Sequence, residues 1–154
     1  MSIPLPDTTF GKIIFEGKKY KILNNPINEK IKKEIAKYKA QKKLFYSAPW
    51  NSDNYLWIVK NDKLYLKQIT IFGNDNFLQE TFNQDELFAK WQSNPIKLLI
   101  SKKNLDIPNN RLSKLVIMKI KILHFKDGIL IDIKDSTEKF KMRKNLVELG
   151  YHFD

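Results

Sequence analysis

Apolar and polar residues alternate along much of the chain with the period of two that is typical of half-buried strands. The clearest case lies in residues 115–125, where Met118 and Ile120 share one face and Lys119 and Lys121 share the other. Similar strand-type runs occupy residues 10–15, 18–23, 44–48, 55–60, 63–71, 95–101, 129–133 and 139–142. Their connections are too short for helical crossovers, so we expect a mainly antiparallel sheet.

Three dipeptides predict tight turns within this sheet. Glu16-Gly17, Asn61-Asp62 and Asp127-Gly128 each lie between two strand-type runs and hold residues that tolerate the positive φ of a hairpin turn. After the last turn, the alternate isoleucines from Ile129 to Ile133 are expected to face inward. Residues 72–83 and the segment from Lys102 to Leu112 are predicted to be loops.

Two helices are expected. Asn25-Pro26 indicates a helix start, with a side-chain cap followed by proline in the first turn. The apolar residues that follow recur at helical spacing up to about Lys43; they are Ile27, Ile31, Ile35 and Tyr38. A second, short helix is predicted over residues 85–92. The pattern therefore favours a single-domain α+β fold, a largely antiparallel sheet with two helices packed on it. Residues 1–9 and 150–154 are expected to be flexible.

Composition narrows the class of protein. The 154 residues suit one domain, and an apolar content of 42% is enough for a core. There is no cysteine, which excludes disulfides and thiolate metal sites. No apolar run approaches the roughly 18 residues of a membrane-spanning helix, and the amino terminus lacks the pattern of a secretion signal. We therefore expect a soluble, cytoplasmic protein.

The net charge of +11 predicts an acidic or polyanionic partner. Only Arg111 and Arg143 are arginines, whereas the other basic residues are all lysines. Arginine reads phosphates and bases better because its planar fork binds two acceptors at once, which counts against sequence-specific nucleic-acid recognition. The lysine excess also fits the codon drift of an AT-rich genome.

Residues 30–43 hold seven lysines against one acid, Glu34. The predicted helix places several of them away from its apolar stripe, where they form a candidate docking face made of Lys32, Lys33, Lys37, Lys39 and Lys43. The alternative is an ordinary solvated helix surface. Trp50, in a predicted loop, is a candidate anchor for a protein interface.

Candidate catalytic chemistry is sparse. His124 and His152 are the only histidines, and no spacing of metal ligands or phosphate-binding loop appears. We therefore predict no catalytic residues, no metal and no cofactor. The alternative is a metal-free ribonuclease that uses His124, with cleavage abolished by His124→Ala.

The order of several short motifs resembles a family of small, uncharacterised bacterial proteins over about residues 10–130. These motifs are Ile13-Ile14-Phe15-Glu16-Gly17, Tyr20-Lys21-Ile22, Asn25-Pro26, Trp50, Tyr55-Leu56-Trp57-Ile58, Asp62 to Leu66, Leu87 to Trp91 and Gly128. The chain departs from the family at Asp53-Asn54, where Arg-Gly is usual, and at Asn109-Asn110-Arg111, where a segment rich in glycine and tyrosine is usual.

Such proteins resemble the immunity proteins of polymorphic toxin systems, including those of contact-dependent growth inhibition. The resemblance implies an intracellular protein that binds a cognate toxin domain and neutralises it sterically, without catalytic residues of its own. Given the positive charge, the bound face of the toxin is expected to be acidic. The alternative is a nucleic-acid-binding domain that uses the lysine-rich helix 30–43, and binding to random RNA and DNA would separate the two.

Overall fold

The computed structural model describes residues 11–42, 53–71 and 73–151. Several predictions lie outside these ranges: the strand over residues 44–48, the two site residues Lys43 and Trp50, His152, and the flexible termini apart from Gly150 and Tyr151.

Eight strands form one sheet among the described residues. Their bounds are β1 (Lys12–Phe15), β2 (Lys18–Ile22), β3 (Asn54–Lys60), β4 (Lys63–Thr70), β5 (Leu87–Phe88), β6 (Ile96–Ile107), β7 (Asn110–Lys126) and β8 (Ile129–Arg143). The order is β3-β1-β2-β6-β7-β8-β4-β5, and a further pairing of β3 with β4 closes seven of them into a ring. All pairings are antiparallel except that of β1 with β3, so the predicted α+β fold with a mainly antiparallel sheet is confirmed.

The main core fills this ring. Alternate residues of its strands point inward, and the largest of them, Trp57, is fully buried between β1 and β4. The predicted hairpin between β3 and β4 is present, with Asn61 and Asp62 at φ values of 51° and 62°. Because left-handed backbone favours asparagine, aspartate and glycine, the sequence of this turn fixes its geometry.

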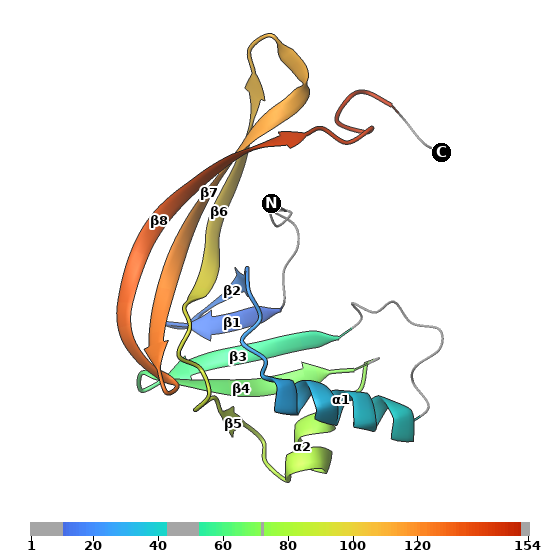
Figure 1. Ribbon diagram of the computed structural model, residues 1–154, viewed down its shortest axis with the longest axis vertical. Helices are drawn as coiled ribbons and strands as arrows, with labels where there is room; N and C mark the ends of the chain where they lie inside the picture. Colours follow the sequence, from blue (N-terminus) through green and yellow to red (C-terminus); the bar gives the residue numbers. More distant parts are fainter. Residues whose placement is uncertain (1–10, 43–52, 72, 152–154) are drawn as a thin grey trace.

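The last three long strands continue beyond the ring as a curved arm (Figure 1). We define the arm as residues 98–107 of β6, 110–121 of β7 and 135–143 of β8; at its base, Leu98 and Leu99 still pair with β2 of the ring. β7 alone has 17 residues, which corresponds to roughly 55 Å at the usual rise of a strand. Figure 1 places the helices at the opposite end of the molecule.

The loop predicted from Lys102 to Leu112 is wrong. β6 runs on to Ile107, only Pro108 and Asn109 turn, and β7 begins at Asn110. Asn109 supplies the positive φ of 62°. Most residues of this stretch are polar because much of the arm faces solvent, and for that reason they resemble a loop in the sequence.

The first helix, α1 (Glu29–Gln41), begins three residues later than predicted. Its cap is Asn28, whose side-chain oxygen accepts a hydrogen bond from the Ile31 amide at 2.9 Å, and not Asn25. Pro26 lies before the helix in a segment without regular secondary structure, where its carbonyl accepts a hydrogen bond from the Trp91 indole at 2.6 Å. The predicted apolar stripe is confirmed for Ile31, Ile35 and Tyr38, which are buried, whereas Ile27 lies before the helix.

The second helix, α2 (Phe77–Phe82), lies where a loop was predicted. Phe77 and Leu78 are buried, and the Phe77 ring meets Tyr38 of α1 edge-on at 5.1 Å. The helix predicted over residues 85–92 is absent. The Ala89 amide donates to the Leu64 carbonyl at 2.8 Å, and β5 pairs with β4, so the backbone of this segment is engaged in the sheet and cannot form helical hydrogen bonds.

The prediction that the alternate isoleucines of β8 all face inward is wrong: Ile133 shares a face with buried Leu123, but Ile129 pairs with exposed Lys126 and Ile131 has no partner. Ile129, Ile131 and Ile133 are 38%, 62% and 41% exposed. A bulge leaves Ile131 without a partner on β7, since Leu130 pairs with Phe125 and Asp132 pairs with His124. The extra residue shifts the alternation, so Leu130 packs against the main core.

Candidate binding face of the arm

The strand register separates the side chains of the arm onto two faces, because directly opposite residues share a face. One cross-strand row is Lys103, Ile117 and Lys139, and the next is Leu105, Leu115 and Lys141. We call this side the basic face. Its cations are Lys103, Lys119, Lys121, Lys139, Lys141 and Arg143.

The basic face carries a single acid. Asp135 lies at the base of the arm, with an oxygen 3.8 Å from the Lys121 ammonium. Within the described part of the chain, the other five cations have no carboxylate within ion-pair distance. All five are exposed to solvent. This arrangement produces a strong positive field over one side of the arm.

The centre of the basic face is apolar. Three half-buried residues form this centre. Leu105 of β6 pairs directly with Leu115 of β7, and Ile117 follows Leu115 two residues further along β7. No aromatic residue belongs to this face within residues 98–107, 110–121 and 135–143. The arrangement, an apolar centre bordered by cations, is that of many protein interfaces, whereas single-stranded nucleic acid is usually held by aromatic stacking as well.

The opposite face has a different character. Val116, Met118 and Ile120 of β7 are buried there in a second apolar cluster, which includes Phe140 and Met142 of β8. The basic residues of this face are mostly compensated: for example, the Lys97 ammonium contacts Glu138 at 3.0 Å. Two of the three acids of the arm, Asp106 and Glu138, therefore lie on the face opposite the unpaired cations.

Residues 144–151 fold back onto the end of this opposite face. Asn145 and Glu148 cap each other reciprocally, the side chain of each accepting the other's amide. Lys144 binds Asp106 at 2.9 Å, and Lys114 binds Glu148. A lysine hydrogen bond to each carboxylate holds the pKa of Asp106 and of Glu148 below its ordinary value.

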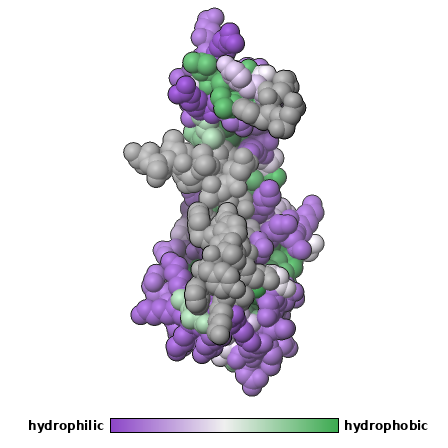
Figure 2. All heavy atoms as spheres, turned by 90° about the vertical axis from the view of Figure 1, so that its right-hand side faces the viewer, coloured by the Kyte–Doolittle hydropathy of each residue, from purple (hydrophilic) through white to green (hydrophobic). Residues whose placement is uncertain are grey.

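Exposed apolar residues gather near this end of the arm (Figure 2). Leu112, Leu146, Val147 and Tyr151 are each half or more exposed. Lys144 anchors the segment by donating its amide to the Leu112 carbonyl at 2.8 Å. These residues cap the arm on the side opposite the basic face and add no cation to that face.

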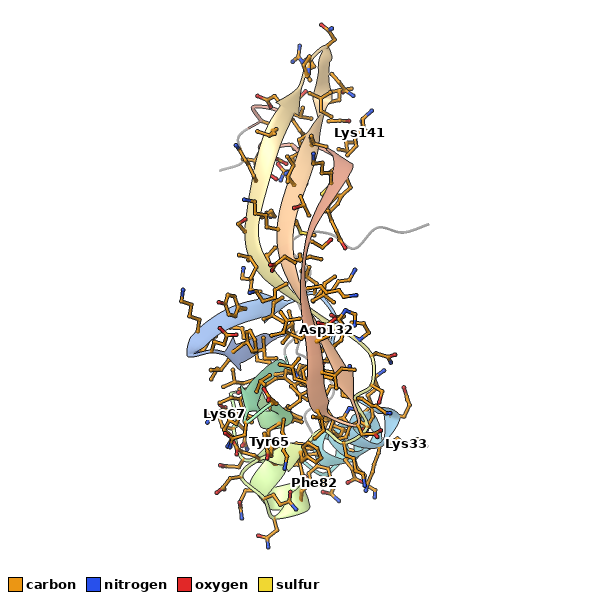
Figure 3. All side chains as sticks on the ribbon, turned by 90° about the vertical axis from the view of Figure 1, so that its left-hand side faces the viewer. Lys33, Tyr65, Lys67, Phe82, Asp132 and Lys141 are labelled. Atoms are coloured by element: carbon orange, nitrogen blue, oxygen red, sulfur yellow. The ribbon has the colours of Figure 1, made fainter. Side chains whose placement is uncertain are left out.

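The docking face predicted on α1 is largely neutralised by neighbouring acids. Lys32 contacts Glu29 at 3.2 Å, and Lys37 contacts Glu34 at 3.8 Å. Lys39 points to Asp53 in a mostly buried pair at 2.8 Å. Of the predicted cluster, Lys33 is exposed with no carboxylate within ion-pair distance among the described residues. Figure 3 shows how far Lys33 lies from Lys141, near opposite ends of the molecule.

The basic face was not among the predicted sites, although the sequence holds a signal for it. Residues 139–143 read Lys-Phe-Lys-Met-Arg, a strict alternation that places three cations on one side of a strand. Only the register with β7 and β6 shows that Lys119 and Lys103 join them.

The described residues bring no catalytic constellation together. His124 is half-buried opposite Asp132 of β8, and no polar side chain within the described part donates to it or accepts from it. Among the same residues, no three histidine, aspartate or glutamate side chains lie close enough to hold a metal ion. An open hollow of about 290 Å³ between α1 and α2 is lined by Tyr38 and Glu80. Burial, followed by the nearby Glu80 carboxylate, raises the pKa of Tyr38 to about 12, so this phenol is no base near neutral pH.

Comparison with known proteins adds no relative. The chain matches no described protein family, and no curated protein or solved structure shows significant similarity to it. In the part of the chain that the structure describes, no helix has the length and apolar character needed to cross a bilayer.

Proposed function

We propose that the protein is a cytoplasmic immunity protein that binds a cognate toxin domain and blocks it sterically. The contact is made by the basic face of the arm, and the toxin surface that it covers is acidic. The observation that supports this proposal is the segregation of charge, with five unpaired cations around an apolar centre on one face of a rigid sheet.

The energetics of such a contact divide between two kinds of residue. Burial of Leu105, Leu115 and Ile117 against the partner contributes affinity, because apolar area is removed from water. The surrounding lysines mainly raise the association rate and exclude partners with basic surfaces. Since each arm strand is hydrogen-bonded to its neighbours, little ordering is needed on binding.

The test compares two double variants with the same change in charge. Lys139→Glu/Lys141→Glu reverses two cations of the basic face, whereas Lys32→Glu/Lys37→Glu reverses two cations of the original α1 candidate. Each is co-expressed with the cognate toxin domain, which is first sought in the gene directly upstream, and growth is measured. Association rates of the purified proteins are measured across salt concentrations, after circular dichroism confirms folding.

We expect the basic-face variant to lose protection and to associate at least about tenfold more slowly at low salt, within the range of electrostatic steering. The α1 variant should protect normally and associate within about threefold of the wild type. Equal losses in the two variants would show that only net charge matters and would refute the assignment to the basic face. An association rate that does not fall as salt rises would refute the acidic partner.

A second candidate function is sequence-independent binding to a nucleic-acid backbone. It is favoured by the regular spacing of Lys139, Lys141 and Arg143, which recur every second residue along β8, about 6.7 Å apart. Five phosphate contacts predict that log K falls with log salt at a slope of about −4 to −5 on duplex DNA and about −3.5 on single-stranded RNA. Fluorescence anisotropy with random RNA and duplex DNA measures these slopes, and micromolar binding with these slopes would favour this candidate over the immunity protein.

A further inference from the structure

The outer edge of β8 is open along most of its length. On one side β8 pairs with β7 from Ile129 to Arg143. On the other side it pairs with β4 only at Ile129, where the Leu130 amide donates to the Asp62 carbonyl at 2.6 Å. From residue 132 to residue 143, no strand in the described part of the chain lies on this side. Backbone donors and acceptors at alternate residues of this edge are therefore available to an additional strand.

The side chains along this open edge alternate in chemistry. Lys139, Lys141 and Arg143 point to the basic face, and Phe140 and Met142 point to the opposite face, where they are half-buried. A strand placed beside β8 would have its side chains about 4.5–5.5 Å from these residues in directly opposite pairs. Residues on one of its faces would meet cations, and residues on its other face would meet apolar groups.

We propose that an extended segment of the toxin domain, with acidic and apolar residues in alternation, adds to the open edge of β8 as a further antiparallel strand. The proposal rests on the proposed function and specifies how the acidic partner is held. Backbone hydrogen bonds to β8 give affinity, and the carboxylates opposite Lys139, Lys141 and Arg143 set the register. The apolar residues of the segment extend the cluster that contains Phe140 and Met142.

Charge excludes a second copy of this chain from the same edge. If two β8 edges paired around residues 139–143 with their basic faces aligned, lysines and arginines would lie directly opposite one another, which destabilises the pairing. Lysine on an exposed edge commonly prevents self-association for this reason. An acidic strand would place carboxylates opposite these cations and turn the repulsion into attraction. The residues that prevent self-pairing would therefore favour an acidic partner.

The experiment uses the full chain and two synthetic peptides of equal composition. The first alternates glutamate and valine, and the second carries the glutamates in one block followed by the valines. Binding is followed by NMR, and amide hydrogen exchange is measured over residues 132–143. A strand added to β8 protects every second amide of this stretch, namely those not already bonded to β7, whereas contact with the basic face alone protects none of them.

We expect the alternating peptide to slow exchange of the outward-facing amides at least about tenfold and to bind at least about tenfold more tightly than the block peptide. The variant Lys139→Glu/Lys141→Glu should abolish both effects, and Lys32→Glu/Lys37→Glu should abolish neither. Equal affinity for the two peptides, or chemical-shift changes without amide protection, would refute strand addition.

These refuting results would leave the proposed function standing if the basic-face variant still lost its protection against the toxin. Sedimentation of the protein alone is expected to show a monomer. A dimer that Lys141→Glu alters would refute the argument from like charges and make a second copy the occupant of the edge.

Discussion

Gly128 closes the ring of strands, and its replacement gives the sharpest test of this fold. It has a φ of +80° at the turn between β7 and β8. Its amide donates to the Gln92 carbonyl at 2.8 Å, and its carbonyl accepts from the Leu64 amide at 2.9 Å. A Cβ atom at this position would lie only 2.5 Å from the Ala89 carbonyl oxygen, a backbone atom that already accepts the Gln92 amide at 3.0 Å.

Gly17 provides a matched control. It has a nearly identical φ of +78° in the turn between β1 and β2, but no heavy atom lies within 4 Å of an added Cβ. Gly17→Ala therefore measures the cost of left-handed backbone alone, about 1–2 kcal/mol. Gly128→Ala adds overpacking against backbone, about 1–3 kcal/mol, for a total of about 2–5 kcal/mol. The entropy that alanine removes from the unfolded chain is the same in both variants and cancels in the comparison.

Urea unfolding at equilibrium measures both variants against the wild type. We expect the free energy of unfolding to fall in both and to fall by at least about 1 kcal/mol more in Gly128→Ala, with the denaturant slope unchanged. Equal losses would mean that the junction of β8 with β4 and β5 is looser than described, so the ring would not be closed there. Because Gly128 lies far along β8 from the basic face, the association rate with an acidic partner should be unaffected while the variant is folded.

Three further outcomes are expected. Ile131→Thr should change the free energy of unfolding by less than about 0.5 kcal/mol, whereas Leu130→Thr should cost more than about 1 kcal/mol; the reverse order in urea unfolding would contradict the bulge. Tyr38 has a raised pKa of about 12, so the folded state holds the phenol proton more tightly than the unfolded state does. The free energy of unfolding should therefore decline as the pH rises from about 10 towards 12, and phenolate absorbance of Tyr38 should appear at higher pH than that of an ordinary tyrosine. The pKa values of Asp106 and Glu148 are lowered in the folded state. The stability that their ion pairs give to the folded C-terminal segment is therefore fully present above the ordinary carboxylate pKa, and it is lost as the pH falls through the lowered values. Amide exchange at residues 149–151, corrected for the intrinsic effect of pH, should therefore speed up in acid, and an unchanged exchange rate would mean that these ion pairs do not hold the segment.

Local features of the fold were predictable because short-range physics decides them. The turns at Glu16-Gly17 and Asn61-Asp62 lie as predicted, since few residues tolerate positive φ. The apolar stripe of α1 was identified correctly because helical spacing alone brings Ile31 and Ile35 onto one side. The helix begins later than its pattern predicts because the Pro26 carbonyl binds the indole of the distant Trp91, a contact that no local pattern reveals.

The density of lysines in the sequence and their availability at the surface differ for a similar reason. A dense run of lysines in the sequence suggested α1, but the charge available at a surface depends on which acids lie nearby. Lys39 meets Asp53, which is 14 residues away in the chain, and Lys42 meets Glu80 of α2. The cations of the basic face are dispersed along three strands. Their spacing in the sequence therefore does not predict that they lie close together in space.

The sequence by itself determined that this chain forms a mostly antiparallel sheet, where its tight turns lie, and that it carries a large excess of lysine. The tertiary structure alone decided that the strands close into a ring, that three of them extend into an arm, and that unpaired cations collect on one face of it. The physical reason is that alternation with a period of two assigns each side chain to one of two faces but does not say which face is buried. Register and bulges, set by contacts between distant residues, make that choice, and the shift at Ile131 shows that one extra residue is enough to reverse it.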